Sequence, residues 1–262
     1  MPELPETETI ARDLDRKVSG ARITGVEVTK ADVLREVSPR ELDRRTAGTV
    51  IERSWRRAKL VVLDLSTGDR LVVQPRFTGA LLIDDGKLPE RERAYSTVEF
   101  RLDDGRSIHY RDIRRLGTVA LMHSERFARY SSALGVEPLD PAFTADHLSV
   151  LLRGSRQAVK KLLMDQRAIV GIGNIYANEA LFRARIDPSR AARTVTTDEA
   201  VAMHAAIVNV LRESIAARGT TRSSTRCANQ RRPSRSAGCS RMSSRSTSTG
   251  DSQRQPRSRV RE

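Results

Sequence analysis

The sequence predicts a multidomain α+β protein, in which an N-terminal helix and a β-sandwich precede an all-α domain and a disordered basic tail. Short, alternating runs rich in β-branched residues fill the first half of the chain. Helical periodicity replaces them after His123, and aliphatic residues almost disappear beyond Thr221. We therefore expect domains at 1–124 and 125–219, followed by a tail over 220–262.

The first part of the chain should contain one helix and then strands. Apolar residues recur at i, i+4 and i+8 from Ile10, which predicts a helix over 4–18. Over residues 21–122 the apolar period falls to two, with STGD and DDG turns between several runs. This pattern predicts seven or eight strands in a sandwich or a partly closed barrel.

A helical pattern extends through the second part of the chain. Amphipathic segments separated by loops predict helices at 125–135, 144–154, 156–166 and 175–186. The sequence TTDE at 196–199 is a capping box, so a final helix should open there, and Gly219 is placed to end it.

Charge and composition point to a polyanionic partner. The chain carries a formal net charge of +14, which favours nucleic acid, although an arginine-rich genome would produce the same excess. No apolar run is long enough to cross a bilayer, and the polar N-terminus is unlike a secretory signal. We therefore expect no association with membranes.

Both cysteines, Cys227 and Cys239, lie in the tail, together with eleven arginines and two acidic residues. Two isolated cysteines support neither a disulfide framework nor a four-ligand zinc site, and the histidines show no ligand spacing. We therefore expect no metal and no other cofactor in catalysis. A chain without cysteine before its tail fits a reducing cytoplasm.

The opening MPELPETE is a candidate catalytic centre. Removal of Met1 would leave Pro2 with a free secondary amine, and an α-amine has a far lower pKa than a lysine side chain. At a helix N-terminus the dipole disfavours its protonated form further, which predicts a neutral, nucleophilic amine. Glu3 and Glu6 project from the same helix, so either could act as general acid or base. An ordinary helix N-terminus explains the same residues, because proline and glutamate both favour the first turn of a helix.

Two segments of the strand region carry residues suited to DNA. Lys59 lies where the basic stretch WRRAK meets a strand, although a strand-end lysine in solvent has the same pattern. In IRRLG, Arg114 and Arg115 suit contacts with bases or phosphates, and Leu116 suits an apolar wedge in the base stack. An exposed basic turn is the alternative for this second segment.

The GIGN turn at 171–174 is a candidate phosphate site. Its glycines allow close backbone approach, and free N–H groups at a helix start bind anions. Lys160 and Asn174 could contact the same DNA strand. A plain connection between two helices explains the turn equally well.

Taken together, these segments resemble the formamidopyrimidine-DNA glycosylases, a family of DNA repair enzymes. MPELPETE is similar to the family's amino terminus, and LGVEPL at 134–139 resembles its interdomain motif. LMDQRAIVGIGNIYANEALFRARIDP resembles its helix–two-turn–helix segment almost position by position. The resemblance covers residues 1 to about 221, and it implies that the all-α domain is a helix–two-turn–helix DNA-binding domain.

The resemblance implies a role for each residue of the N-terminal cluster. Pro2 would attack C1′ of the damaged nucleotide, and Glu3 would protonate the sugar ring oxygen. Glu6 would support the site from the next turn of the helix. Lys59 matches a hairpin lysine that contacts DNA near the lesion.

The resemblance also implies DNA contacts elsewhere. Lys160 and Asn174 match phosphate-binding positions, with Tyr176 beside them. Arg115, next to Arg114, matches the arginine that enters the duplex opposite the lost base. No metal takes part in the implied chemistry.

The implied reaction is bifunctional. The damaged base leaves the stack, Pro2 displaces it and forms a Schiff base with the opened sugar, and β,δ-elimination at both phosphates follows. The implied substrates are oxidised purines, such as 8-oxoguanine and formamidopyrimidines, and abasic sites in double-stranded DNA. A cytoplasmic monomer is expected.

Three departures from the family pattern stand out. Phe77 occupies the position of a void-filling methionine, and Leu116 occupies that of a wedge phenylalanine. Both are bulky and apolar, so they can still act as wedges. The largest departure is 222–262, which does not resemble the four-cysteine zinc finger that follows in relatives.

The composition of the tail suggests its origin. Arginine- and serine-rich sequence with few aliphatic residues is typical of GC-rich DNA read out of frame, so a frameshift near codon 221 is our hypothesis. The family's structural zinc is then expected to be absent, and DNA binding is expected to be weaker. A catalytically weak or inactive DNA-binding relative is the alternative function.

Overall fold

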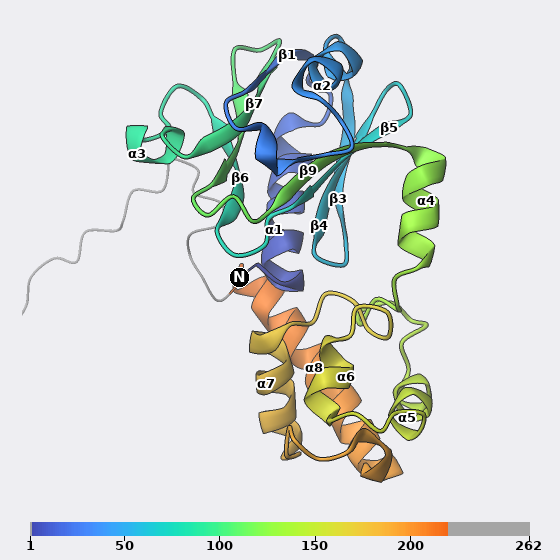
Figure 1. Ribbon diagram of the computed structural model, residues 1–262. Helices are drawn as coiled ribbons and strands as arrows, with labels where there is room; N and C mark the ends of the chain where they lie inside the picture. The colour runs from blue at the N-terminus through green and yellow to red at the C-terminus, as the bar shows by residue number, and fades with distance from the viewer. Residues whose placement is uncertain (1, 220–262) are drawn as a thin grey trace, which may run out of the picture. The chain divides into compact units, whose positions relative to one another are not determined.

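The structure is a computed structural model that describes residues 2–219 (Figure 1). The expectations for the tail over 220–262, including those for Cys227 and Cys239, lie outside the described residues. The helices are α1 (Leu4–Val18), η1 (Ala31–Val33), α2 (Pro39–Thr46), α3 (Glu90–Arg93), α4 (Ser124–Ser132), α5 (Ala145–Arg153), α6 (Val159–Met164), α7 (Asn174–Ala184), η2 (Ala192–Thr194) and α8 (Thr197–Ala216), where η marks a 3₁₀ turn. The strands are β1 (Ile23–Val28), β2 (Leu34–Arg35), β3 (Ile51–Arg57), β4 (Leu60–Leu65), β5 (Asp69–Gln74), β6 (Gly79–Asp84), β7 (Ser96–Leu102), β8 (Ser107–Asp112) and β9 (Thr118–His123).

The strands form a two-layer sandwich. Within residues 2–219 one sheet has the order β1-β7-β8-β6 and the other the order β2-β9-β5-β4-β3. Apolar side chains of both sheets meet in one buried cluster, which includes Val61, Leu71, Phe100 and Tyr110. This arrangement confirms the predicted sandwich, with the two-residue strand β2 as an addition to the predicted set.

The helix α1 has the bounds that the sequence predicts and links two hydrophobic cores. Ile10, Leu14 and Val18 are buried with the sandwich cluster, as their spacing requires. Leu4 instead lies in the hydrophobic cluster of the helical region, and its N–H donates to the carbonyl of Gly171 at 3.0 Å. The first turn of α1 is therefore packed against the GIGN turn.

The helices after β9 follow the predicted pattern. The capping box of α8 is confirmed, because Thr196 and Glu199 exchange backbone-to-side-chain hydrogen bonds of 2.8 and 3.3 Å. Hydrogen bonds from Arg190 and from the Thr196 N–H lower the pKa of Glu199 to about 2. Gly219, predicted to cap this helix, has a φ of +85° and donates its N–H to the carbonyl of Ser214. The C-cap residue is instead Ala217, and Arg218, with a φ of +64°, is the first left-handed residue after it.

The helices α2 and α3 and the 3₁₀ turn η1 lie where the sequence pattern predicts only strands, and α2 is the longest of them. The helix α2 begins after Ser38, whose hydroxyl accepts the N–H of Glu41 at 3.2 Å, and Pro39 occupies its first turn. These are ordinary start signals. Leu42 and Thr46 are its two buried residues, so the helix carries little apolar periodicity. No helix described within residues 2–219 is long and apolar enough to cross a membrane.

Candidate active site

Glu3 is the residue around which the site is built. It caps the N-terminus of α1 directly after the half-buried Pro2, and it is 1% exposed. Its carboxylate accepts hydrogen bonds from the N–H groups of Gly173 at 2.7 Å, Ile175 at 3.0 Å and Tyr176 at 3.4 Å. Amide donors at the start of α7 thus hold a carboxylate that comes from the far end of the chain.

The same contacts correct one expectation. The GIGN turn was a candidate phosphate site because amides at a helix start bind anions. In the structure the N–H groups of Gly173, Ile175 and Tyr176 already have an anionic partner, the carboxylate of Glu3. For these amides the phosphate prediction is wrong, and the turn instead fixes a side chain next to Pro2.

Glu6 connects the same two helices. Its Oε2 accepts the N–H of Glu3 at 3.0 Å, and its Oε1 accepts the hydroxyl of Tyr176 at 2.7 Å. Glu6 and Tyr176 are both buried. A DNA contact for Tyr176 stays a prediction, and in the free chain its hydroxyl supports the N-terminal turn of α1.

Lys59 reaches the cluster from the sandwich. It lies in the two-residue turn between β3 and β4, where Arg57 pairs with Leu60. A Cβ atom built on Gly173 would lie 2.6 Å from Oε1 of Glu3 and 2.7 Å from Nζ of Lys59. The carboxylate and the ammonium therefore converge over the bare Cα of Gly173. Burial lowers the pKa of Lys59, and the nearby charges of Glu3 and Glu6 offset part of this effect.

The lowered pKa of Lys59 gives a stability prediction. The fold disfavours the charged form, so Lys59→Met should raise the thermal midpoint at neutral pH, by roughly 2–4 °C for each 1 kcal/mol gained in a chain of this size. The unfolded chain binds the proton more tightly, so the parent's stability rises with pH between the folded and unfolded pKa values. The advantage of Lys59→Met should therefore shrink as the pH rises through that window. Melting curves across alkaline pH measure both effects, and a destabilised variant at neutral pH would refute the prediction.

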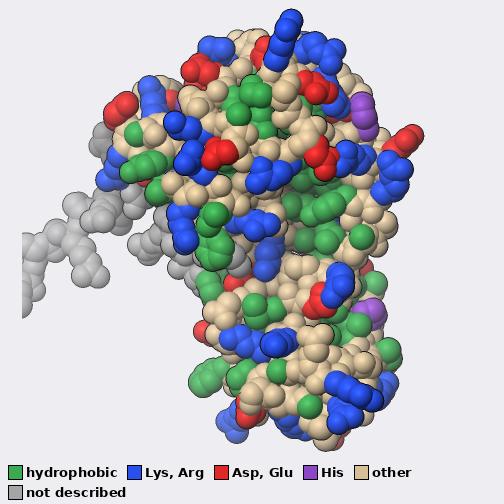
Figure 2. Space-filling view, in the orientation of Figure 1, with side chains coloured by type: hydrophobic (Ala, Val, Ile, Leu, Met, Phe, Trp, Pro, Cys, Tyr) green, Lys and Arg blue, Asp and Glu red, His purple; other side chains and the backbone are tan. Residues whose placement is uncertain are grey.

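Two loops present the residues predicted to enter DNA. Phe77, between β5 and β6, is 50% exposed, and Leu116, between β8 and β9, is 41% exposed. The loops are joined, because the N–H of Arg114 donates to Thr78 at 3.0 Å and its guanidinium lies 5.2 Å from the ring centroid of Phe77. Figure 2 shows Lys and Arg side chains spread over the face it presents, as binding to a polyanion requires.

The remaining predicted DNA contacts are more dispersed. Arg115 has a φ of +51°, and its guanidinium forms an ion pair of 3.0 Å with Asp32. Asn174 is exposed at the start of α7, next to Gly173. Lys160 is half-buried near the start of α6, and its N–H donates to Pro188. Their contacts with DNA stay predictions.

The ion pair of Arg115 must open before its guanidinium can enter a duplex. Both partners are about half exposed, and such pairs contribute roughly 0.2–1 kcal/mol. We expect Asp32→Asn to tighten binding to a duplex with an abasic site by about twofold to fivefold. Fluorescence anisotropy at several salt concentrations measures it. Asp104→Asn, which removes an equal charge beside Arg106, is the control, and equal tightening by both variants would contradict a specific role for Asp32.

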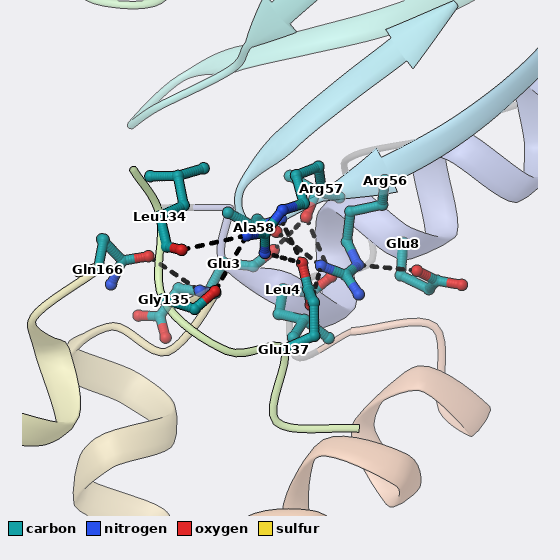
Figure 3. A network of polar contacts seen from close by, with 12 residues as sticks. Glu3, Leu4, Glu8, Arg56, Arg57, Ala58, Leu134, Gly135, Glu137 and Gln166 are labelled. Atoms are coloured by element: carbon teal, nitrogen blue, oxygen red, sulfur yellow. Dashed lines mark hydrogen bonds and ion pairs between the residues drawn. The ribbon is translucent and has the colours of Figure 1, made fainter. Parts of the chain in front are cut away.

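Sequence reasoning missed the residues that position the cluster. Gly173 was considered only as a glycine of the GIGN turn that allows close backbone approach. Glu137 was noted only within LGVEPL, yet its carboxylate accepts hydrogen bonds from Arg56, Arg57 and the N–H of Ala58 (Figure 3). The charges in WRRAK and in LGVEPL were the available signal, but nothing in the sequence pairs these two segments.

Comparisons with known proteins match the chain along most of its length. Residues 1–119 match the formamidopyrimidine-DNA glycosylase N-terminal domain, and residues 134–226 match the formamidopyrimidine-DNA glycosylase H2TH domain. The formamidopyrimidine-DNA glycosylase of Pelotomaculum thermopropionicum is 41% identical over 223 residues, which cover 84% of this chain and 80% of the relative.

Solved structures of the same kind superpose on the chain. Lactococcus lactis formamidopyrimidine-DNA glycosylase, non-covalently bound to DNA with an abasic site, has a TM-score of 0.77 at 25% identity, with 83% of each chain covered. The wild-type Lactococcus lactis protein in complex with DNA containing an N7-benzyl-formamidopyrimidine lesion has a TM-score of 0.79 at 26% identity. That superposition covers 85% of this chain and 82% of the other.

Proposed function

The chain belongs to the formamidopyrimidine-DNA glycosylase family, and from this premise we propose that Pro2, Glu3 and Lys59 form its catalytic centre. It is a base excision repair DNA glycosylase, and its partner is double-stranded DNA with damaged bases or abasic sites. The observation that carries the residue assignment is the convergence of Glu3 and Lys59 over Gly173, directly beside the chain's N-terminal proline.

Pro2 is the proposed nucleophile. After removal of Met1, its secondary amine lies at the start of α1, where the dipole favours the neutral form. The nitrogen lone pair forms a bond to C1′ of an extruded nucleotide, and the bond from C1′ to the base breaks with its electron pair on the base. The amine proton released by this attack passes to Glu3.

Glu3 then carries the proton to the ring oxygen. The C1′–O4′ bond breaks, O4′ takes the proton, and the nitrogen lone pair completes the iminium ion. Glu3, again a carboxylate, takes a C2′ proton, and the 3′ phosphate leaves with the electron pair of its bond to C3′. Loss of a C4′ proton to water then expels the 5′ phosphate with the electron pair of its bond to C5′. Because three backbone N–H groups fix the Glu3 carboxylate, it needs no reorganisation during these transfers.

Lys59 and the exposed loops have supporting roles in this proposal. The half-buried ammonium of Lys59 contacts the lesion and stabilises negative charge on the departing base. Phe77 and Leu116 fill the space that the extruded nucleotide leaves, and Arg115 faces the opposite base. Lys160, Asn174 and Arg114 hold phosphates. We place the enzyme in the cytoplasm as a monomer.

We also propose that this chain works without the structural zinc of the family. Its whole sequence contains two cysteines, and the described part of the chain has no cluster of three or more metal-binding side chains. This donor set does not fit a four-cysteine site. Dialysis against a chelator should leave the excision rate unchanged, and metal analysis should find far less than one zinc per chain. A rate that falls on dialysis and returns with zinc would contradict the proposal.

The test of the proposed function uses a duplex with a single 8-oxoguanine. The purified chain should release the free base and leave phosphate on both ends of the gapped strand. Release of the base without strand cleavage would overturn the elimination steps. Specific binding to the duplex without base release would favour the alternative, a DNA-binding relative without catalysis.

A further inference from the structure

The segment LGVEPL at 134–139, here called the linker, contains a residue, Glu137, whose side-chain hydrogen bonds all come from the hairpin of Lys59. We propose that Glu137 is a positioning residue that fixes the β3–β4 turn and so holds Lys59 against Glu3 and the lesion. The inference rests on the proposed role of Lys59, but it concerns what places this lysine. Glu137 touches neither of the reacting groups and acts through the turn.

Both oxygens of the Glu137 carboxylate accept hydrogen bonds from the hairpin. Its Oε1 accepts the N–H of Ala58 at 2.7 Å and Nη1 of Arg57 at 2.9 Å, and its Oε2 accepts Nη1 of Arg56 at 2.7 Å (Figure 3). All three charged side chains are shielded from solvent, with 9–19% of each exposed. Charge-assisted hydrogen bonds in such a site are short and directional, so they define the position of the turn.

The peptide groups that flank Ala58 are held on both sides. Its N–H donates to Glu137, and its carbonyl accepts Nη1 of Arg56 at 3.0 Å, while the same Nη1 also donates to Glu137. The carbonyl of Ala58 belongs to the peptide bond that leads into Lys59. Glu137 therefore fixes the backbone at the point from which the lysine side chain extends.

The turn needs such support because its backbone is strained. Ala58 has a φ of +54°, a region that residues with a Cβ atom avoid. Strained conformations persist only where surrounding contacts hold them, and they gather at functional sites. Here the surrounding contacts come from Glu137 and the two arginines that it pairs with.

The linker also contacts the segment that leads into the turn holding Glu3. Val136 pairs with Ile169 in a short bridge, and the N–H of Gly135 donates to the carbonyl of Gln166 at 2.9 Å. The side chain of Gln166 in turn bonds the N–H of Gly171 and the carbonyl of Ile172. One segment thus sets both the hairpin that carries Lys59 and the turn that holds Glu3.

Arg57, directly before the turn, has further contacts that do not involve Glu137. Arg57 donates through Nη2 to the carbonyls of Ser131 and Gly135, and through Nε to the hydroxyl of Ser131. These bonds remain when Glu137 is replaced. Removal of its carboxylate should therefore loosen the turn at Ala58 without detaching the hairpin from the linker.

The experiment combines Glu137→Ala with Lys59→Met. Glu137→Ala should lower single-turnover excision of 8-oxoguanine by about tenfold to a hundredfold, because a misplacement of about 1 Å has effects of this size. Cleavage of a preformed abasic site, which relies on Pro2 and Glu3, should change far less. In the Lys59→Met background, Glu137→Ala should have almost no further effect on excision. The excision rate of Glu137→Gln should lie between those of the parent and of Glu137→Ala, because the amide oxygen of glutamine can still accept the Ala58 N–H.

Asp64→Asn is the matched control. Asp64 lies on β4 of the same hairpin, is similarly shielded and pairs with Arg53 and Arg70, but it does not contact the turn. Its replacement reports the general cost of removing a carboxylate that pairs with two arginines. We expect excision to stay close to the parent rate in this variant.

A second readout does not depend on catalysis. The chain has six lysines, and Lys59→Met identifies the Lys59 signal in NMR spectra of isotope-labelled side chains. Its pKa should be below the ordinary lysine value in the parent and should move toward that value in Glu137→Ala. The inference is overturned if Lys59 titrates identically in both proteins, or if Glu137→Ala lowers excision equally with and without Lys59. If the parent releases no base, the proposed function fails, and the titration alone decides the role of Glu137.

Discussion

Glu3→Gln should lower excision of 8-oxoguanine by about 10²–10⁴-fold, the range associated with loss of a general acid–base group. Both carboxylate oxygens accept backbone N–H groups, Oε2 from Gly173 and Tyr176, and Oε1 from Ile175. A carboxamide has one acceptor oxygen, so its NH₂ group would face at least one of these donors. It also cannot take the proton released by Pro2. Single-turnover release of the base from a duplex measures the loss.

The control for Glu3→Gln is Asp15→Asn. Asp15 lies on the same helix, and its carboxylate accepts the N–H of Ser54 at 2.8 Å, far along α1 from Pro2. We expect this variant to excise the base at the parent rate. Excision by Glu3→Gln within about tenfold of the parent, with binding unchanged, would remove Glu3 from the proton-transfer role.

Gly173→Ala should lower excision by about a hundredfold through crowding alone. A Cβ atom at this position would lie 2.5 Å from Cδ of Glu3 and 2.7 Å from Nζ of Lys59, so both groups must move. The φ of Gly173 is −131°, which alanine adopts without strain. The backbone and the start of α7 should therefore persist, while the catalytic groups are displaced. Base release and circular dichroism, measured on the same sample, separate these effects.

Gly154→Ala is the matched control for this variant. Gly154 ends α5, and a Cβ atom built there would meet no heavy atom closer than 3.5 Å, an ordinary contact. It should retain the parent activity. If Gly173→Ala also retained it, Glu3 and Lys59 could not be acting from the positions in which the structure places them.

Local signals in the sequence were sufficient for the main elements. Helical spacing from Ile10 predicted α1, and the pair Thr196 and Glu199 predicted the start of α8, because both signals depend on neighbours along the chain. The helix α2 was missed although Ser38 and Pro39 mark its start, since its short apolar face gave no periodicity.

The geometry of the site depended on contacts between distant segments. Glu3 meets Gly173 across most of the chain, and Glu137 meets Ala58 from the linker, so no local pattern links either pair. The free N–H groups expected at a helix start suggested a phosphate for the amides near Gly173, whereas the fold gives them the carboxylate of Glu3. The sequence likewise could not indicate that Tyr176 is buried and donates its hydroxyl to Glu6.

The central claim is that the amine of Pro2 forms the covalent bond to the sugar. The most direct measurement is borohydride trapping of the mature chain on a duplex with one abasic site, followed by digestion and mass spectrometry of the DNA-bearing peptide. We expect the adduct on the N-terminal peptide at Pro2, and its loss from a chain that retains Met1. An adduct on Lys59 or another lysine, or an equal yield from the chain that retains Met1, would contradict the claim.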